Sequence, residues 1–116
     1  MANYVREINL ELGYPSVDQA LRRLNAELDS SRHLRAPALK LIHGYGSSGK
    51  GGRIRTACRK QLKAELEQGR ILDFIPGERF TIFEESTRRA FARCSALRQD
   101  PDLERCNSGV TFVLFK

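Results

Sequence analysis

Residues 38–63 read ALKLIHGYGSSGKGGRIRTACRKQLK, and this stretch decides the fold of the chain. It opens with an apolar run, residues 38–43, of the kind that forms a buried strand. Five of the ten positions from His43 to Gly52 are glycine, and from Ile54 onward an apolar residue returns every four positions, which is the spacing of one helix face. The stretch therefore predicts a strand, a glycine-rich loop (residues 43–52) and a helix over residues 53–67.

A second strand and helix precede this stretch. Residues 5–12 alternate apolar and polar side chains, with Leu10 and Leu12 on the apolar face, as in a half-buried strand. Ser16 is expected to begin a helix, because Gln19 follows three positions later and completes a capping box. With the strand at residues 38–43 these elements make a β-α-β unit, whose strands normally run parallel and bind ligands at their carboxyl ends.

The remaining elements give the order β-α-β-α-β-β. Gly69 is expected to end the second helix, and strands are expected at residues 70–75 and 110–115. Residues 79–106 form a helical insertion between these last two strands. Its helix is expected around residues 84–94, and its predicted inward contacts are Phe83, Ala90, Phe91 and Cys94.

The length and composition of the chain are typical of a small globular domain. A chain of 116 residues with 41% hydrophobic and 29% charged residues is expected to form a single domain, residues 1–116, with one core. It has no apolar run long enough to cross a bilayer and no secretory signal, so we expect a cytoplasmic protein. The three cysteines include no Cys-x-x-Cys pair, which argues against a disulfide framework and a zinc site. The oligomeric state stays open, with a monomer favoured.

The net charge of +6 predicts an anionic partner. Nucleic acid, an anionic membrane surface and an acidic protein all meet this condition. A membrane-bound helix needs a free apolar face, and the predicted helices use theirs for the core, so we expect no membrane partner.

The glycine-rich loop and the helix after it predict an anion site. Glycine lets the backbone approach a phosphate closely, and the free amides at a helix start attract anions. Arg55, Arg59 and Lys63 follow at four-residue steps and predict an exposed basic stripe. The alternative is a loop beside a solvated helix face. The predicted contacts to phosphate are His43, Gly44, Tyr45, Gly46, Ser47, Ser48, Gly49, Lys50, Gly51, Gly52, Arg53, Arg55, Arg59 and Lys63.

Residues 44–51 also come close to a Walker A phosphate loop, Gly-x-x-x-x-Gly-Lys-Ser/Thr. Position 51 is glycine, so the hydroxyl that holds Mg²⁺ in such loops is missing. Hydrolysis of a nucleoside triphosphate is therefore disfavoured.

The order of elements, with His-Gly-x-Gly after the second strand, resembles the Smr (small MutS-related) domain family. The matching residues are 8–13, 17–21, 41–46, 54–62 and 109–114, which extend over nearly the whole chain. The resemblance implies an α+β two-layer sandwich with a mixed four-stranded sheet, similar to the C-terminal domain of a bacterial translation initiation factor. It also implies binding of DNA or RNA and, in several members of the family, endonuclease activity.

The sequence departs from that family at the end of the first strand, where its nucleases carry a Leu-Asp-x-His motif. Alignment from Ile8 puts Asn9 at the acid and Glu11 at the histidine, and a shifted register puts Leu12 there. An imidazole that could relay protons is lost. Glu11 is a candidate general base, although a carboxylate beside a phosphate is unfavourable without a metal. The alternative for Glu11, as for Glu7, is a solvated strand residue.

His43 is the other candidate catalytic residue, because it stands at a strand end beside the glycines. The alternative is a structural histidine whose ring bonds to the backbone of the loop. Tyr45 is expected either to stack on a base or sugar or to cover the edge of the core. His33 is assigned to the basic surface, and Cys58, on the apolar helix face, is not expected to be a nucleophile.

Three functions follow from these residues. A nucleic-acid-binding module is favoured, since the basic loop and helix are complete. A DNA or RNA endonuclease, nicking or structure-specific, would use His43 with Glu11 or Glu7, either without a metal or with a divalent metal such as Mg²⁺ or Mn²⁺. A protein-interaction or regulatory domain would leave the anion site unused. For the favoured function, no cofactor and no metal ligands are expected.

Overall fold

The computed structural model describes residues 2–45 and 50–116. Strands and helices in these ranges follow one another in the order expected from the sequence. The strands are β1 (Val5–Asn9), β2 (Ala38–Ile42), β3 (Asp73–Pro76) and β4 (Val110–Leu114), and the helices are α1 (Val17–His33), α2 (Lys50–Glu67) and α3 (Glu85–Arg93). Short 3-10 turns flank α3, namely η1 (Gly77–Arg79) before it and η2 (Ser95–Gln99) after it.

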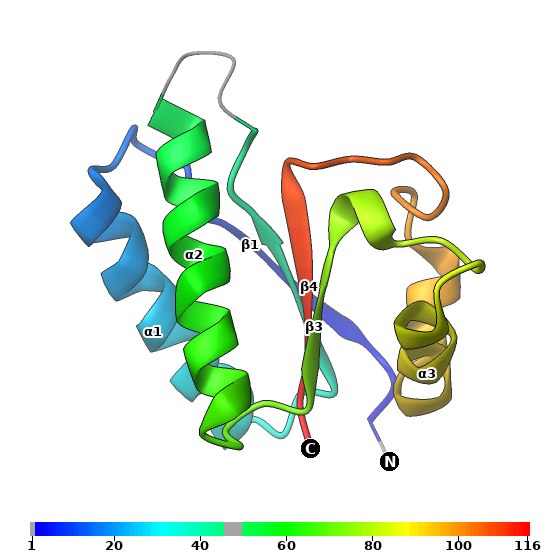
Figure 1. Ribbon diagram of the computed structural model, residues 1–116. Coiled ribbons are helices and arrows are strands. Elements are labelled where there is room, and N and C mark those ends of the chain that lie inside the picture. The colour runs from blue at the N-terminus through cyan, green and yellow to red at the C-terminus, as the bar shows by residue number, and fades with distance from the viewer. Residues whose placement is uncertain (1, 46–49) are drawn as a thin grey trace.

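The four strands form one mixed sheet in the order β1-β2-β4-β3. β1 and β2 run parallel and are joined by the crossover helix α1, whereas β4 runs antiparallel to both β2 and β3. β4 is therefore a central strand, and all of its residues are buried. The predicted α+β sandwich with a mixed four-stranded sheet and a helical insertion before the last strand is confirmed (Figure 1).

Local signals in the sequence begin and end the helices. The capping box at α1 forms as predicted, because Ser16 Oγ accepts from Gln19 N at 3.2 Å and Gln19 Oε1 accepts from Ser16 N at 2.9 Å. α2 ends before Gly69, whose φ of +72° is a left-handed conformation that glycine adopts without strain. Within the part of the chain that the structure describes, no helix has the length and apolar character needed to cross a membrane.

Helices cover both faces of the sheet (Figure 1). α1 and α2 lie side by side on one face. The fully buried residues between them and the sheet include Leu24, Leu41, Leu62 and Val113. The insertion packs on the opposite face, where the ring of Phe80 meets Phe91 edge to face and lies 4.1 Å from the centroid of Phe112. The insertion therefore builds a second apolar core.

Two of the predicted apolar contacts are wrong. Leu12 is 70% exposed, because β1 is shorter than predicted and the chain turns at Gly13, with φ +81°, before α1. Phe83 is 84% exposed, and Phe80 provides the buried ring of the insertion instead. The other inward contacts predicted for the insertion are buried, namely Ala90, Phe91 and Cys94.

A buried lysine ties the insertion to the sheet. Lys40 lies in the middle of β2 with 5% of its side chain exposed, and its Nζ contacts Asp102 Oδ2 at 2.6 Å and Asp100 Oδ1 at 3.0 Å. Glu7 adds a longer contact at 3.9 Å. Burial by itself lowers the pKa of Lys40, but the hydrogen bonds and charges of the two aspartates outweigh burial and raise it. The ammonium therefore stays charged inside the protein.

We expect the Asp100→Asn/Asp102→Asn variant to lose about 3 kcal/mol in its free energy of unfolding, because the buried ammonium keeps only the exposed Glu7 nearby. Urea denaturation at neutral pH measures this loss. Adding Lys40→Met removes the unpaired charge and should recover much of the stability. A triple variant as unstable as the double variant would contradict this explanation.

Candidate functional site

The predicted site lies at one end of the sheet, where the carboxyl ends of β1 and β2 meet the start of β4 (Figure 1). Ile42 O accepts from Leu10 N at 2.8 Å, which joins the ends of the two parallel strands. Gly109 O accepts from both His43 N and Gly44 N at 3.0 Å, which joins the loop to β4. Outside the described residues lie the predicted contacts Gly46, Ser47, Ser48 and Gly49, together with the side chain of Lys50.

His43 is fully buried beneath this loop, and both of its ring nitrogens are bonded. Nδ1 lies 2.8 Å from Gly44 O, and Nε2 lies 2.7 Å from Thr111 Oγ1. A carbonyl can only accept, so Nδ1 carries the proton and Nε2 accepts from the threonine hydroxyl. In this arrangement His43 cannot touch a substrate, which corrects the direct catalytic contact predicted for it. The ring matches the alternative role, a structural histidine bonded to the loop.

The surroundings of His43 also keep the ring neutral. Burial lowers its pKa from 6.5 to about 4, and the positive charges of Arg59 and Arg55 act in the same direction. The hydrogen bond to Gly44 O opposes them without overcoming them. At neutral pH the side chain therefore holds its two bonds as an uncharged ring.

Arg59 extends the same network from α2. Its guanidinium forms a two-pronged ion pair with Glu78, with both distances at 2.8 Å, and its Nε donates to Thr111 Oγ1 at 3.1 Å. Its Nη2 also donates to the carbonyls of Ser108 and Val110. Burial raises the pKa of Glu78, but the bonds from Arg59 lower it further, so it lies below its ordinary value. The predicted exposed stripe is therefore wrong at Arg59, whose side chain is 19% exposed and neutralised.

Gly44 and Glu11 approach each other closely. Gly44 has φ +74°, and a Cβ at this position would lie 1.9 Å from Glu11 Oε1. Position 44 therefore requires glycine for two reasons: its backbone conformation is left-handed, and the Glu11 carboxylate leaves no room for a Cβ. The structure therefore brings Glu11, a predicted catalytic residue, against the loop. Glu7 does not join it, because its carboxylate lies near Lys40 instead.

The tyrosine of the loop is open to solvent. Tyr45 is 60% exposed, and its Cδ1 would lie 3.0 Å from a Cβ at Gly109, so the ring rests on a glycine at the start of β4. A second tyrosine, Tyr14, is 94% exposed in the turn between β1 and α1 and has φ +51°. Sequence analysis singled out only Tyr45. The signal for Tyr14 is its place after Gly13, in a turn at the same strand ends.

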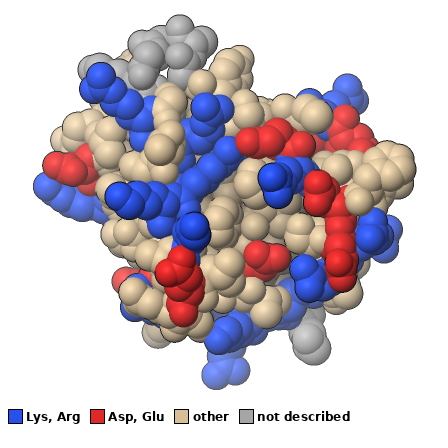
Figure 2. Space-filling view, in the orientation of Figure 1, with Lys and Arg blue, Asp and Glu red and all other residues tan. Residues whose placement is uncertain are grey.

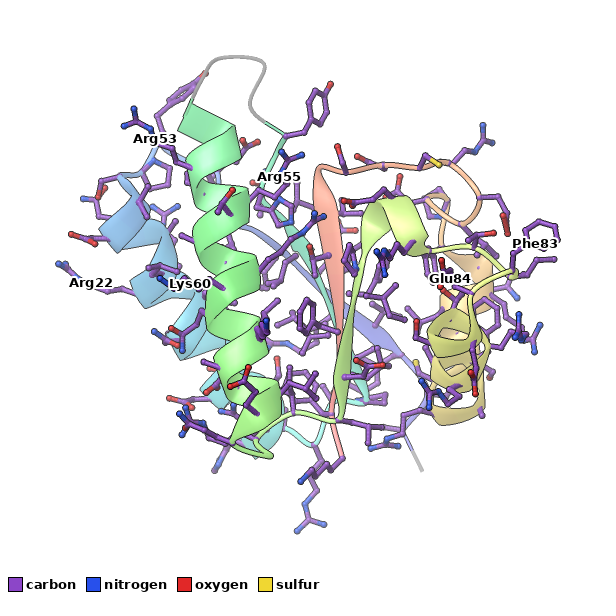
Figure 3. The ribbon with its side chains drawn as sticks, in the orientation of Figure 1. Arg22, Arg53, Arg55, Lys60, Phe83 and Glu84 are labelled. Atoms are coloured by element: carbon purple, nitrogen blue, oxygen red, sulfur yellow. The ribbon has the colours of Figure 1, made fainter. Side chains whose placement is uncertain are left out.

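Among the described side chains of α2, four cations lie outside the Arg59 network. Arg53, Lys60 and Lys63 are exposed and Arg55 is partly buried; we call these four residues the α2 basic surface. Within the described ranges, none of them forms an ion pair with a carboxylate. Figure 2 shows Lys and Arg side chains gathered over α2, and Figure 3 shows Lys60 on the side of α2 that faces Arg22 of α1.

Lys60 was missed by sequence analysis, which followed the four-residue steps from Arg55. The missed signal is its position seven residues after Arg53, because residues seven apart lie two turns apart on the same helix face. Arg53 and Lys60 therefore share one face of α2, Lys63 follows Lys60 by about one turn, and Arg55 lies on the flank toward His43.

The whole arrangement is similar to a solved structure. The crystal structure of the Smr domain of Thermus thermophilus MutS2 superposes with a TM-score of 0.59 at 23% sequence identity, over 96% of this chain and 98% of that one. The chain has the fold of an Smr domain. Neither the family models nor the curated proteins contain a match to its sequence. The resemblance inferred from the sequence motifs is thus confirmed at the level of the fold.

Few side chains that could act as metal ligands, nucleophiles, acids or bases lie at the glycine-rich loop in the described part of the chain. Among the described residues, no three His, Cys, Asp or Glu side chains are grouped so that they could hold a metal ion. Cys58 is buried on α2, and burial raises its pKa to about 12, so its thiol is protonated at neutral pH. Glu11 and the buried His43 are the candidate acid-base groups that the structure brings to the loop.

A neutral buried histidine predicts a specific pH dependence of stability for this Smr fold. The pKa of His43 is 6.5 in an unfolded chain and about 4 in the folded one, so between these values only the unfolded chain takes up the proton. Stability is therefore lost as the pH falls. We expect the free energy of unfolding to drop by about 2 kcal/mol from pH 7 to pH 5 through this group.

Urea denaturation of His43→Gln at the two pH values measures this contribution, which the variant should lack. The control is His33→Gln, which changes an exposed histidine and should retain the wild-type dependence. If wild type and His43→Gln lost equal stability on acidification, His43 would not be the titrating group.

Proposed function

We propose that this chain binds DNA or RNA through the α2 basic surface and the adjoining glycine-rich loop. The observation that carries the proposal is that Arg53, Lys60 and Lys63 are exposed cations on one helix, with no carboxylate paired to them in the described part of the chain. Repeated positive charge on one face weakens an isolated helix, so a polyanion that binds along it offsets that repulsion.

The composition of the surface favours contacts to the phosphate backbone. Lysine and arginine side chains on a helix neutralise phosphates without reading the sequence of bases. Residues 50–52 of the glycine-rich loop form the first turn of α2, where backbone amides without helical partners attract anions. The sequence resemblance to the Smr family, whose members bind nucleic acid, points in the same direction. We therefore expect binding with little sequence preference.

The exposed tyrosines favour a nucleic acid with unpaired bases. Tyr45 presents an exposed ring in the glycine-rich loop that leads into α2, and aromatic rings in basic surfaces stack on bases that are not held in a duplex. Tyr14 presents a second ring in the neighbouring turn. Single-stranded segments or strand ends would let these rings contribute to binding.

Phosphodiester hydrolysis has less support than binding. It requires an accessible acid or base, and the buried His43 is bonded at both nitrogens. Glu11 is the accessible candidate, since its carboxylate lies against Gly44. Incubation of labelled DNA and RNA with the protein, with and without Mg²⁺ or Mn²⁺, tests this alternative when the nucleic acid is afterwards resolved on gels.

The proposal predicts a change in the salt dependence of binding. Each lost phosphate contact lowers the slope of log K against log salt by about 0.9 on duplex DNA and about 0.7 on a single strand. Arg53→Gln/Lys60→Gln should therefore reduce the slope on single-stranded DNA by about 1.4 and weaken binding about tenfold or more at low salt. Fluorescence anisotropy of labelled oligonucleotides over a series of salt concentrations measures both quantities.

The matched control is Arg89→Gln/Arg105→Gln, which removes two exposed cations from the insertion and makes the same change in net charge. It should leave the slope close to that of wild type. Equal effects of the two double variants would reject the α2 basic surface as the binding site. Cleavage that Glu11→Gln abolishes while binding persists would replace the proposal by a nuclease.

A further inference from the structure

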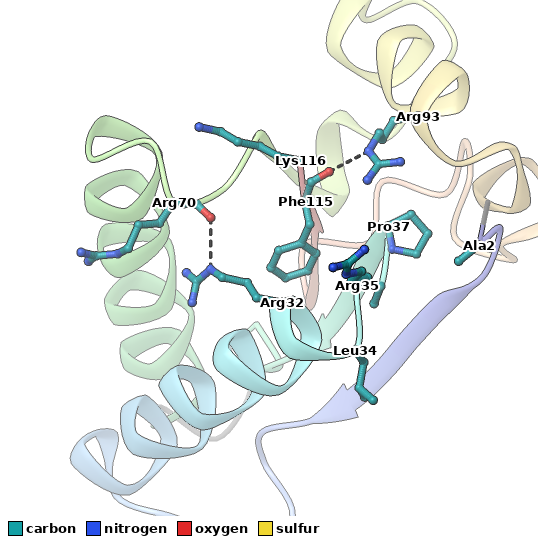
Figure 4. Close-up of a pocket in the computed structure, with 10 residues that line it drawn as sticks. Ala2, Arg32, Leu34, Arg35, Pro37, Arg70, Arg93, Phe115 and Lys116 are labelled. Carbon is teal, nitrogen blue, oxygen red and sulfur yellow. Dashed lines mark hydrogen bonds between the residues drawn. The ribbon is translucent and has the colours of Figure 1, made fainter.

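A cavity lined by cations lies at the opposite end of the sheet from the glycine-rich loop. Its volume is about 790 Å³, and it opens where the chain enters β2 and leaves β4. Figure 4 shows its lining, and Figure 1 shows that the chain termini lie at this end. The charged side chains of the lining come from four separate segments and are all basic: Arg32, Arg35, Arg70, Arg93 and Lys116.

Only part of this positive charge is neutralised by the protein. Arg32 pairs with Asp29 at 2.8 Å and with the buried Glu65 at 2.6 Å, and Arg70 also pairs with Glu65, so these two cations are neutralised. Arg35, Arg93 and Lys116 form no ion pair with any residue that the structure describes. Folding thus gathers several like charges around one cavity, which is electrostatically unfavourable unless an anion occupies it.

Arg35 is placed at the cavity against its own backbone preference. Ala36 N donates to Ser31 O at 2.9 Å, which is the closing bond of the Schellman motif that ends α1. In that motif the residue in the left-handed position is usually glycine, and here Arg35 takes it with φ +56°. An arginine carries strain that glycine would avoid, and what it adds at this position is a guanidinium in the cavity.

Arg93 reaches the cavity from the opposite wall. Its Nε donates to Phe115 O at 2.7 Å, which orients the guanidinium beside the end of β4 (Figure 4). Among the described residues, its terminal nitrogens have no hydrogen-bond acceptor, and neither has the Arg35 side chain. The two guanidinium groups therefore keep donors available for a ligand. Leu34, Pro37 and Phe115 provide apolar wall between the charges.

We propose that this cavity binds a phosphomonoester of about nucleotide size, held by Arg35 and Arg93. Guanidinium groups bind phosphate oxygens through paired hydrogen bonds, and the double negative charge of a phosphomonoester matches the two cations of this cavity. The volume lies within the range of small-molecule sites, and the apolar wall can pack against a base. Two sources share this chemistry, namely a free nucleotide and the phosphorylated end of a nucleic-acid strand. Binding of a free nucleotide does not depend on the proposed binding of nucleic acid by α2, whereas binding of a strand end rests on it.

The test measures binding of AMP by isothermal titration calorimetry and of a short single-stranded oligonucleotide, with and without a 5′ phosphate, by anisotropy. The variant is Arg35→Gly/Arg93→Gln. Arg35→Gly alone also relieves the left-handed strain, so its midpoint of thermal unfolding should equal or exceed that of wild type. The control is Arg53→Gln/Lys60→Gln, which makes the same charge change on the α2 basic surface.

We expect saturable binding of AMP, or a gain in oligonucleotide affinity from the 5′ phosphate, that weakens about tenfold or more in the cavity variant. The α2 control should leave AMP binding and the gain from the 5′ phosphate unchanged, although it weakens the oligonucleotide equally with and without that phosphate. AMP binding identifies a free nucleotide, and a gain that appears only with the 5′ phosphate identifies a strand end. Absence of both, or equal binding by wild type and the cavity variant, overturns the proposal. Since AMP does not need the α2 basic surface, failure of that surface to bind nucleic acid leaves this result interpretable.

Discussion

The hydroxyl of Thr111 lies between an arginine from α2 and the histidine that follows β2, and the rest of the functional end depends on it. It accepts from Arg59 Nε at 3.1 Å and donates to His43 Nε2 at 2.7 Å. Glu78 neutralises the arginine, and Gly44 O accepts from the other ring nitrogen. One continuous chain of hydrogen bonds, buried at His43 and exposed at Glu78, therefore holds β4, the end of β2, α2, η1 and the loop in a fixed relation. Its buried members would be costly to leave unpaired.

This network sorts the cations of α2 by role. Arg59 bonds to the start of the central strand β4 and has a structural role, because its charge is matched by Glu78. Arg53, Lys60 and Lys63 turn to solvent and keep their charge available. Arg55 stands between these groups, close enough to lower the pKa of His43. The same helix can thus stabilise the loop on one flank and present a basic surface on another.

The insertion covers the second face of the sheet and contributes Arg93 to the basic cavity at the end near the chain termini. Lys40 fixes the insertion from the middle of the sheet through Asp100 and Asp102, and the apolar core around Phe80 fills the remaining space. Once docked, α3 brings Arg93 to the carbonyl of Phe115 at the end of β4. The sheet therefore carries basic groups at both ends, one beside the glycine-rich loop and one beside the chain termini (Figure 1).

The sequence by itself determined the element order, the capping box at Ser16, the glycine that ends α2 and the loop between β2 and α2. These features depend on local periodicity and backbone preference, which neighbouring residues carry. Tertiary structure decided which side chains remain accessible. His43 and Arg59 are residue types that often serve in functional sites. Partners distant in sequence bury His43 and neutralise Arg59. Accessibility and charge pairing are properties of contacts between segments, so no local pattern could assign them.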